Sequence, residues 1–271
     1  MDPNGTFRRI RCGARLAAMK RRVLLALVLL LAAGGGRGET TLSVGAAANL
    51  KLAAQELALA FEAERPGVKV ALTFGASGTF FAQIQNGAPF DLFLSADREY
   101  PDRVVAEKLG AADDERIYAL GKLVVWVPAG STLDVERRGI AALGDPSVKR
   151  IAIANPAVAP FGRAAEAALR AAGVYDAVKD RLVLGTSVAQ AAQFATTGAA
   201  DAALLPCSLT FDPELSRGQA VPVPGELHPR IEQAGVVLSR AQEPVLARAF
   251  LAFVTGEKGR AILTRYGYGL P

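Results

Sequence analysis

The stretch "TFGASGTFFAQIQNGAPFDLFLSAD", residues Thr73–Asp97, contains a turn, a helix and a strand in immediate succession. Its small, uncharged turn GASG (Gly75–Gly78) follows the apolar run VKVALTF and precedes the helix-like segment TFFAQIQNG. The next apolar run, FDLFLSA, has the composition of a strand that is buried on both faces. A strand, a helix and a second strand in this order predict a parallel sheet with helices on its faces.

The same alternation continues along the chain. Upstream, TTLSVGAAANL predicts a strand that runs into a turn, and the following segment predicts a helix that ends at Pro66-Gly67. Further strands are expected in LGKLVVWVPAG, RIAIANP, RLVLGTS, AALLP and EQAGVVLS, with helices between them and two helices near the C-terminus. The charged run DDER (113–116) is expected to be solvated surface. The pattern predicts two α/β lobes, with lobe I formed by 39–121 plus 226–271 and lobe II by 122–225.

The charge of the chain is concentrated at its N-terminus. The formal net charge is +5, but residues 1–38 contain eight of the 31 Lys and Arg residues and one of the 26 acidic residues. Residues 39–271 therefore carry 23 basic and 25 acidic side chains, a net charge of −2. Because binding to a phosphate backbone requires clustered Lys and Arg, we expect no nucleic-acid partner.

The N-terminal segment has the layout of a secretory signal peptide, which we assign to residues 1–38. The basic residues Lys20–Arg22 precede an apolar run, Val23–Ala33, and a small-residue segment. This run of eleven residues is much shorter than the roughly 20 that span a bilayer as a helix. We expect export to the periplasm, with Met19 as an alternative start that would make residues 1–18 an over-extended N-terminus. The exported chain would keep Cys207 as its one cysteine and have no internal disulfide.

Four strand-to-helix junctions are rich in small, uncharged residues: Ala46–Asn49, Gly75–Gly78, Asn155–Gly162 and Gly185–Val188. In open parallel sheets ligands bind beyond the carboxyl ends of the strands, and helix N-termini there offer unpaired N–H groups to anions. An Asn or Ser before a helix is often only an N-cap. Four such junctions, distributed over both lobes, instead favour an oxyanion held by neutral donors.

The chain has little material for catalysis. Its single histidine, His228, lies in the loop-like segment ELHPR, and no P-loop, dinucleotide-binding turn or G-x-S-x-G motif occurs. A nitrogen- or sulfur-rich metal site would need more His or Cys than the exported chain contains. We therefore expect no enzyme, no cofactor and no metal site, and we expect Tyr266 and Tyr268 to be packing anchors.

The junction segments resemble those of the periplasmic molybdate-binding proteins of ABC transporters. The resemblance rests on VGAAANL, NGAPFDLFLSAD, NPAVAPFG, VLGTSVAQAAQFATTGAADAALLP and RYGYGLP, and extends from about Thr41 to Pro271. It implies a two-lobed periplasmic-binding-protein fold of type II. Each lobe would be a mostly parallel sheet flanked by helices, with the ligand in the cleft between the lobes. The implied protein is a monomer that captures molybdate, and also tungstate, and delivers it to a membrane permease.

Carried over position by position, the family's oxyanion contacts fall on Ala48, Asn49, Ser77, Phe161 and Val188. Ser77 would donate its hydroxyl and N–H groups, and Asn49 its backbone N–H and also its side-chain amide. Phe161 and Val188 would donate backbone N–H groups while their side chains shield the site. Where many members have a hydroxyl residue in the first turn, this chain has Ala48. Where others have a ligating Tyr, it reads Leu205-Pro206-Cys207.

Two other functions are compatible with the same segments. One is a binding protein for another small anion, such as sulfate, a phosphonate or an organic acid. A carboxylate ligand would require an arginine in the cleft, and Arg163 is the nearby candidate. A secreted hydrolase would require Ser77 and His228 to meet across the cleft.

Overall fold

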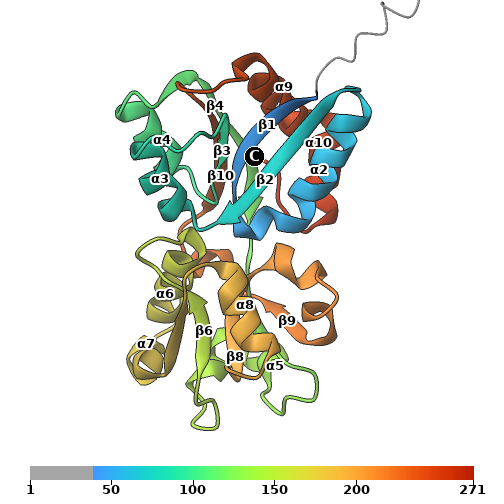
Figure 1. Cartoon of the computed structure of the whole chain (residues 1–271). Coiled ribbons are helices and arrows are strands. Elements are labelled where there is room, and N and C mark those ends of the chain that lie inside the picture. Colours follow the sequence, from blue (N-terminus) through green and yellow to red (C-terminus); the bar gives the residue numbers. More distant parts are fainter. Residues whose placement is uncertain (1–38) are drawn as a thin grey trace, which may run out of the picture. The chain divides into compact units, whose positions relative to one another are not determined.

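The computed structural model describes residues 39–271, so the expected signal peptide lies outside the described residues. Residues Thr40–Pro271 form one compact unit with two five-stranded sheets, each flanked by helices (Figure 1). Within this described part, no helix combines the length and the apolar character needed to cross a bilayer.

The first sheet has the strand order β2-β1-β3-β10-β4. Its strands are β1 (Thr40–Ala47), β2 (Val68–Gly75), β3 (Leu92–Leu94), β4 (Gly110–Gly121) and β10 (Ile231–Leu238). Strands β2, β1 and β3 are parallel to one another, and β10 is antiparallel to both of its neighbours.

The second sheet has the order β7-β6-β8-β5-β9. Its strands are β5 (Leu123–Val127), β6 (Ile151–Ala154), β7 (Leu182–Gly185), β8 (Ala202–Pro206) and β9 (Gln219–Pro222). Here β5 is the strand that is antiparallel to both of its neighbours. In each sheet, four strands therefore run in one direction and one strand is reversed. The reversed strand is in each case the first one after the chain passes from the other sheet.

Helices cover both faces of each sheet. In the first lobe, α3 (Ser77–Gln85) and α4 (Glu99–Ala106) lie on one face. The other face is covered by α2 (Lys51–Ala63), α9 (Pro244–Thr255) and α10 (Glu257–Arg265) (Figure 1). The second lobe contains α5 (Val135–Arg138), α6 (Pro160–Ala171), α7 (Tyr175–Val178) and α8 (Val188–Thr196).

The cores follow from the alternation of side chains along the strands. In β3, Leu92 and Leu94 pack into the cluster formed with α2 and α9, while Phe93 packs with α3 and α4 on the opposite face. This confirms the predicted burial of β3 on both faces. The core of the second lobe continues into small residues of the first lobe, including Ala48 and Ala96.

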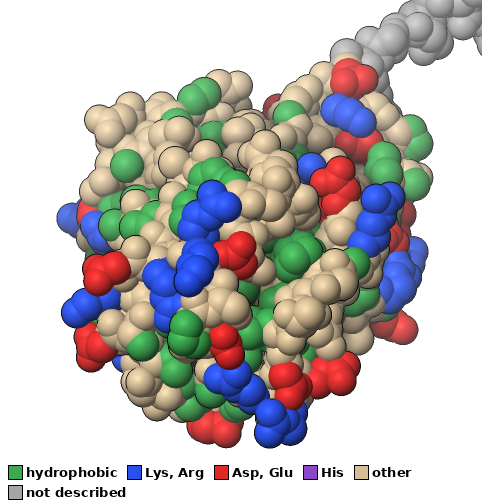
Figure 2. Space-filling view, turned by 90° about the horizontal axis from the view of Figure 1, so that it is seen from below, with side chains coloured by type: hydrophobic (Ala, Val, Ile, Leu, Met, Phe, Trp, Pro, Cys, Tyr) green, Lys and Arg blue, Asp and Glu red, His purple; other side chains and the backbone are tan. Residues whose placement is uncertain are grey.

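The run DDER is at the surface, as the sequence predicted. It lies in β4, whose residues from Ala111 to Arg116 are exposed or partly exposed. Because β4 is an edge strand, its polar residues remain in contact with water while the backbone pairs with β10. On the face of the molecule seen in Figure 2, Lys and Arg side chains lie among Asp and Glu side chains, in keeping with the near-neutral charge of residues 39–271.

Candidate functional site

Strand register places the four helix starts side by side in two pairs, one pair in each sheet. In the first sheet Ala47 lies opposite Gly75, so the turns after β1 and β2 are neighbours. In the second sheet Ala154 lies opposite Gly185, so the turns after β6 and β7 are neighbours too. The 3₁₀ helix η1 (Ala48–Leu50) leads into α2, and the other three turns lead into α3, α6 and α8.

The starts of these four helices line a single small cavity. Its volume is about 10 Å³, and its lining is Ala47, Ala48, Asn49, Gly75, Ala76, Ser77, Ala96, Ala159, Pro160, Phe161 and Val188. All five residues predicted to contact an oxyanion are among them. None of the lining residues is charged, and Asn49 and Ser77 supply the polar side chains.

Three of the helix starts have no side-chain cap. The N-cap residues of η1, α3 and α6 are Ala47, Ala76 and Ala159, which are buried and whose side chains cannot accept a hydrogen bond. At α8, Ser187 caps the helix through the N–H of Gln190 at 3.4 Å. The first N–H groups of an α-helix have no hydrogen-bond partner within the helix. At a buried helix start without a cap, these N–H groups therefore need an acceptor from outside the helix. Each start also contributes a partial positive charge.

Ser77 is fully buried, and its hydroxyl group is oriented by the backbone. The N–H of Ala96 donates to Ser77 Oγ at 3.0 Å. Ala96 is brought there by β3, because Leu94 pairs with Ala46 next to the first turn. A hydroxyl group that accepts a hydrogen bond still has its proton to donate. The structure shows no acceptor for that proton within residues 39–271.

The side-chain amide of Asn49 is already engaged. Its Nδ2 donates to Gln233 Oε1 at 2.9 Å and to the Tyr268 hydroxyl at 3.0 Å. Its backbone carbonyl accepts from the Tyr268 hydroxyl at 2.8 Å and from Ser208 Oγ at 2.9 Å. Both hydrogens of Nδ2 are used in these bonds, so the backbone N–H is the remaining donor group of Asn49. The side chain instead fixes the position of the first turn.

The residues that hold the first turn in place form a buried polar network, which the sequence analysis did not identify. Tyr118 donates to Ser95 O at 2.6 Å and lies 3.1 Å from Gln233 Oε1. Burial raises the pKa of both Tyr118 and Tyr268, so both phenols stay protonated and can donate. Tyr268 is thus a buried anchor, as predicted, and also a hydrogen-bonding partner of the first turn. One signal was present in the sequence: Gln233 is a polar residue within the apolar strand β10.

Phe161 and Val188 occupy the first turns of α6 and α8 and have buried side chains. The Phe161 ring extends toward the point where the chain passes between the sheets. A Cβ atom added to Gly121 would lie 2.7 Å from Phe161 Cζ and 2.8 Å from Gln233 Nε2. Glycine at the end of β4 therefore makes room for the ring that shields this side of the cavity.

Two residues proposed for other functions lie outside the cavity lining. Arg163 is on α6, but its guanidinium group is bound by the carboxylates of Asp97 and Glu99. His228 is in a loop, and its Nδ1 lies 2.8 Å from Pro229 O. No cluster of three or more His, Cys, Asp or Glu residues suited to a metal ion occurs in residues 39–271. The geometry gives no support to a carboxylate-gripping arginine or to a Ser–His pair.

Comparisons with known proteins agree with this architecture. Residues 42–269 match the family model described as bacterial extracellular solute-binding protein. The chain is 37% identical to the molybdate-binding protein ModA of Azotobacter vinelandii, with 84% of this chain and 90% of the relative covered. It is 36% identical to the ModA protein of Rhodobacter capsulatus, with 90% and 93% covered.

A solved structure shows the same fold. The periplasmic molybdate-binding protein of Azotobacter vinelandii superposes with a TM-score of 0.79 at 30% sequence identity, with 85% of this chain and 99% of that chain covered. The two-lobed fold predicted from the sequence is thereby confirmed. The family consists of substrate-binding proteins for transport, not enzymes. On these grounds the chain belongs to the bacterial extracellular solute-binding proteins, together with the molybdate-binding proteins of ABC transporters.

Proposed function

We propose that this protein captures molybdate, and also tungstate, in the cavity between its lobes and delivers the anion to an ABC importer. One observation carries the proposal: four buried helix starts, three of them without a side-chain cap, converge on a cavity that contains no charged side chain. The proposed contacts are the N–H groups of Ala48, Asn49, Ser77, Phe161 and Val188 and the hydroxyl of Ser77.

The chemistry of the donors suits a fully deprotonated tetrahedral oxyanion. Such an anion has only acceptor atoms, and N–H and hydroxyl groups can satisfy them without a counter-charge. The positive ends of the helices add electrostatic stabilisation. Phosphate often carries a proton at neutral pH, and a site made only of donors leaves that proton without an acceptor. Sulfate has the charge and shape of molybdate, so it would be rejected mainly by its size.

Relatives support the same ligand. The two ModA proteins and the solved Azotobacter structure are named as molybdate-binding proteins, and together they align with most of this chain. We extend that ligand to this chain because its cavity is built from the uncharged turns on which the sequence resemblance rests.

The small volume of the cavity fits a binding mode in which the lobes close on the ligand. A volume of about 10 Å³ is close to the room one water molecule needs, and an anion with four oxygens is larger. We propose that lobe I (39–121 plus 226–271) and lobe II (122–225) move apart to admit the anion and then close around it. The closed form would be the one that the permease receives.

Calorimetric titration of the purified protein with molybdate, tungstate, sulfate and phosphate tests the proposal. We expect tight, one-to-one binding of molybdate and tungstate, and weak or no binding of sulfate and phosphate. Tight binding of sulfate or of an organic acid, with no heat from molybdate, would overturn the ligand assignment.

A further inference from the structure

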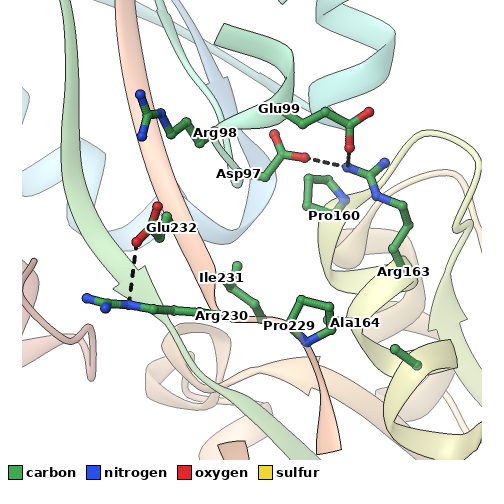
Figure 3. A pocket seen from close by; sticks show the side chains of 11 residues that line it. Asp97, Arg98, Glu99, Pro160, Arg163, Ala164, Pro229, Arg230, Ile231 and Glu232 are labelled. Carbon is green, nitrogen blue, oxygen red and sulfur yellow. Dashed lines mark hydrogen bonds and ion pairs between the residues drawn. The ribbon is translucent and has the colours of Figure 1, made fainter. Parts of the chain in front are cut away.

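A second set of contacts joins the lobes beside the cavity. Arg163 on α6 of the second lobe reaches Asp97 and Glu99, which lie between β3 and the first turn of α4 in the first lobe. Its guanidinium nitrogen is 3.1 Å from Glu99 Oε2, and it also pairs with Asp97. Figure 3 shows both carboxylates directed at the guanidinium group, at the edge of an open cavity of about 460 Å³.

The pair is held more firmly than an exposed ion pair. The Asp97 side chain is 14% exposed and the Arg163 side chain 34%. Ser95 Oγ donates to Asp97 Oδ1 at 2.9 Å and so fixes the carboxylate from behind. The Arg163 guanidinium lies 5.3 Å from the centre of the Tyr100 ring, a cation–π contact. These contacts fix the geometry of the pair, which a partly desolvated ion pair needs if its attraction is to exceed the cost of burying Asp97.

Asp97 and Arg163 each lie within two positions in the sequence of a residue that lines the proposed anion site. Asp97 follows Ala96, whose N–H holds the Ser77 hydroxyl. Arg163 follows Phe161 by two residues on the first turns of α6. Movement of either lobe around the anion must therefore move one end of the ion pair.

A backbone hydrogen bond also joins the two lobes on the side of the cavity where Arg163 lies. The N–H of Gly78, in the first turn of α3, donates to Val158 O of the second lobe at 2.9 Å. The two lobes approach so closely here that a Cβ atom on Gly78 would lie 2.9 Å from Val158 Cα. This edge of the cleft is thus a direct interlobe contact in the closed arrangement.

We propose that Arg163 is a positioning residue that latches the lobes together and sets how long the anion stays bound, without contacting the anion. The inference rests on the proposed function, because it assigns to Arg163 a role in retaining the ligand of the neighbouring cavity. Opening the lobes separates Arg163 from Asp97 and Glu99, so release of the ligand includes the breaking of this pair. A contact present only in the closed state shifts the equilibrium toward that state.

The test compares Arg163→Gln with Arg170→Gln. Arg170 is on the same helix, but it pairs with Glu166 of the same lobe, so it controls for loss of an α6 arginine. Dissociation of molybdate is measured by stopped flow with excess tungstate as the chase, and affinity by calorimetry. For Arg163→Gln we expect dissociation to be faster by about tenfold, with a similar loss of affinity and an association rate within about threefold of wild type. Arg170→Gln should match the wild type.

Two further readouts separate a latch from a general loss of stability. Raising the salt concentration should accelerate dissociation from the wild type more than from Arg163→Gln, because salt screens the pair. The melting temperature of ligand-free Arg163→Gln should stay near that of wild type, while the shift on adding molybdate becomes smaller. If Arg163→Gln does not fold, Glu99→Gln removes one partner whose side chain is 58% exposed, and we expect dissociation about two- to threefold faster.

These experiments distinguish failure of the latch proposal from failure of the proposed molybdate-binding function. A wild-type protein that does not bind molybdate overturns the ligand assignment, and the latch is then tested in the same variants with the anion that calorimetry identifies. A wild type that binds its anion, with dissociation unchanged in Arg163→Gln and Glu99→Gln, overturns the latch alone.

Discussion

Ser77 Oγ lies 3.0 Å from the backbone nitrogen of Ala96 and accepts its hydrogen bond. This contact links the start of α3 to the end of β3 and sets the direction of the hydroxyl group. It uses one lone pair of the oxygen and leaves the proton available. Ser77 is therefore both a structural acceptor and the one side-chain hydroxyl in the cavity lining.

Replacing Ser77 by Ala should weaken molybdate binding by about 1.5–3 kcal/mol, the value for a hydrogen bond to a charged group. Calorimetry of the variant measures this loss. The change also leaves the buried N–H of Ala96 without its acceptor, so the melting temperature of the ligand-free variant has to be measured in parallel. The control is Ser216→Ala, which changes an exposed serine that is not part of the cavity lining. Unchanged affinity in Ser77→Ala would remove this residue from the site.

Replacing Gly78 by Ala should hinder closure of the lobes. The added Cβ would crowd Val158 of the second lobe, so we expect a loss of about 1–3 kcal/mol in molybdate affinity through overpacking. In the ligand-free protein, separated lobes relieve the contact with Val158. The contact of the added Cβ with the Tyr100 hydroxyl of the same lobe remains, so the melting temperature of the ligand-free variant is measured in parallel. Gly225→Ala is the matched control, because nothing lies within 4 Å of the added atom there. Equal affinities for the two variants would contradict the closed geometry at this edge.

Replacing Tyr268 by Phe tests the support of the first turn. The change removes the hydroxyl that donates to Asn49 O and accepts from Asn49 Nδ2. We expect the free energy of unfolding to fall by about 1–2 kcal/mol, and molybdate affinity to fall several-fold as the N–H groups of this turn lose their fixed direction. Urea unfolding measures the free energy of unfolding, and calorimetry measures the molybdate affinity.

Tyr266→Phe is the control for this experiment. Tyr266 lies two residues away and donates to Glu56 at the surface, at 3.0 Å. Its loss should change stability by less than about 0.5 kcal/mol and leave affinity unchanged. If the two variants behave alike, the Tyr268 hydroxyl has no specific role in holding Asn49.

The sequence predicted the elements better than their long-range contacts. Strand–helix alternation and the four uncharged junctions are local patterns, so the strands and the turns around Ala48 and Ser77 were found from periodicity and composition. The side-chain contacts that hold those turns in place join residues that are far apart in the sequence. Asn49 and Tyr268 are 219 positions apart, and Arg163 and Asp97 are 66 apart. Such pairs exist only once the lobes are folded. Under the alternative of an organic-acid ligand, Arg163 was the candidate for gripping a carboxylate of that ligand, whereas the structure places two carboxylates of the protein itself on it.

The acid dependence of stability can be tested at Asp145 in the second lobe. Hydrogen bonds from the Ser147 N–H and hydroxyl groups, with the Arg138 guanidinium, lower the pKa of Asp145 to about 2. A carboxylate whose pKa is lower in the folded than in the unfolded protein stabilises the fold above its unfolded pKa of 3.8. That contribution disappears as the pH falls from about 3.8 toward about 2.

Urea unfolding of wild type and Asp145→Asn at pH 6, 5, 4, 3 and about 2 measures this contribution. We expect the wild type to be the more stable protein at pH 5 and 6, and the difference to shrink toward zero near pH 2, where the native carboxyl group is also becoming protonated. Ser216→Ala removes no titratable group, so its difference from wild type should be the same at every pH. A difference for Asp145→Asn that also stayed constant across this range would show that the charge of Asp145 does not stabilise the fold.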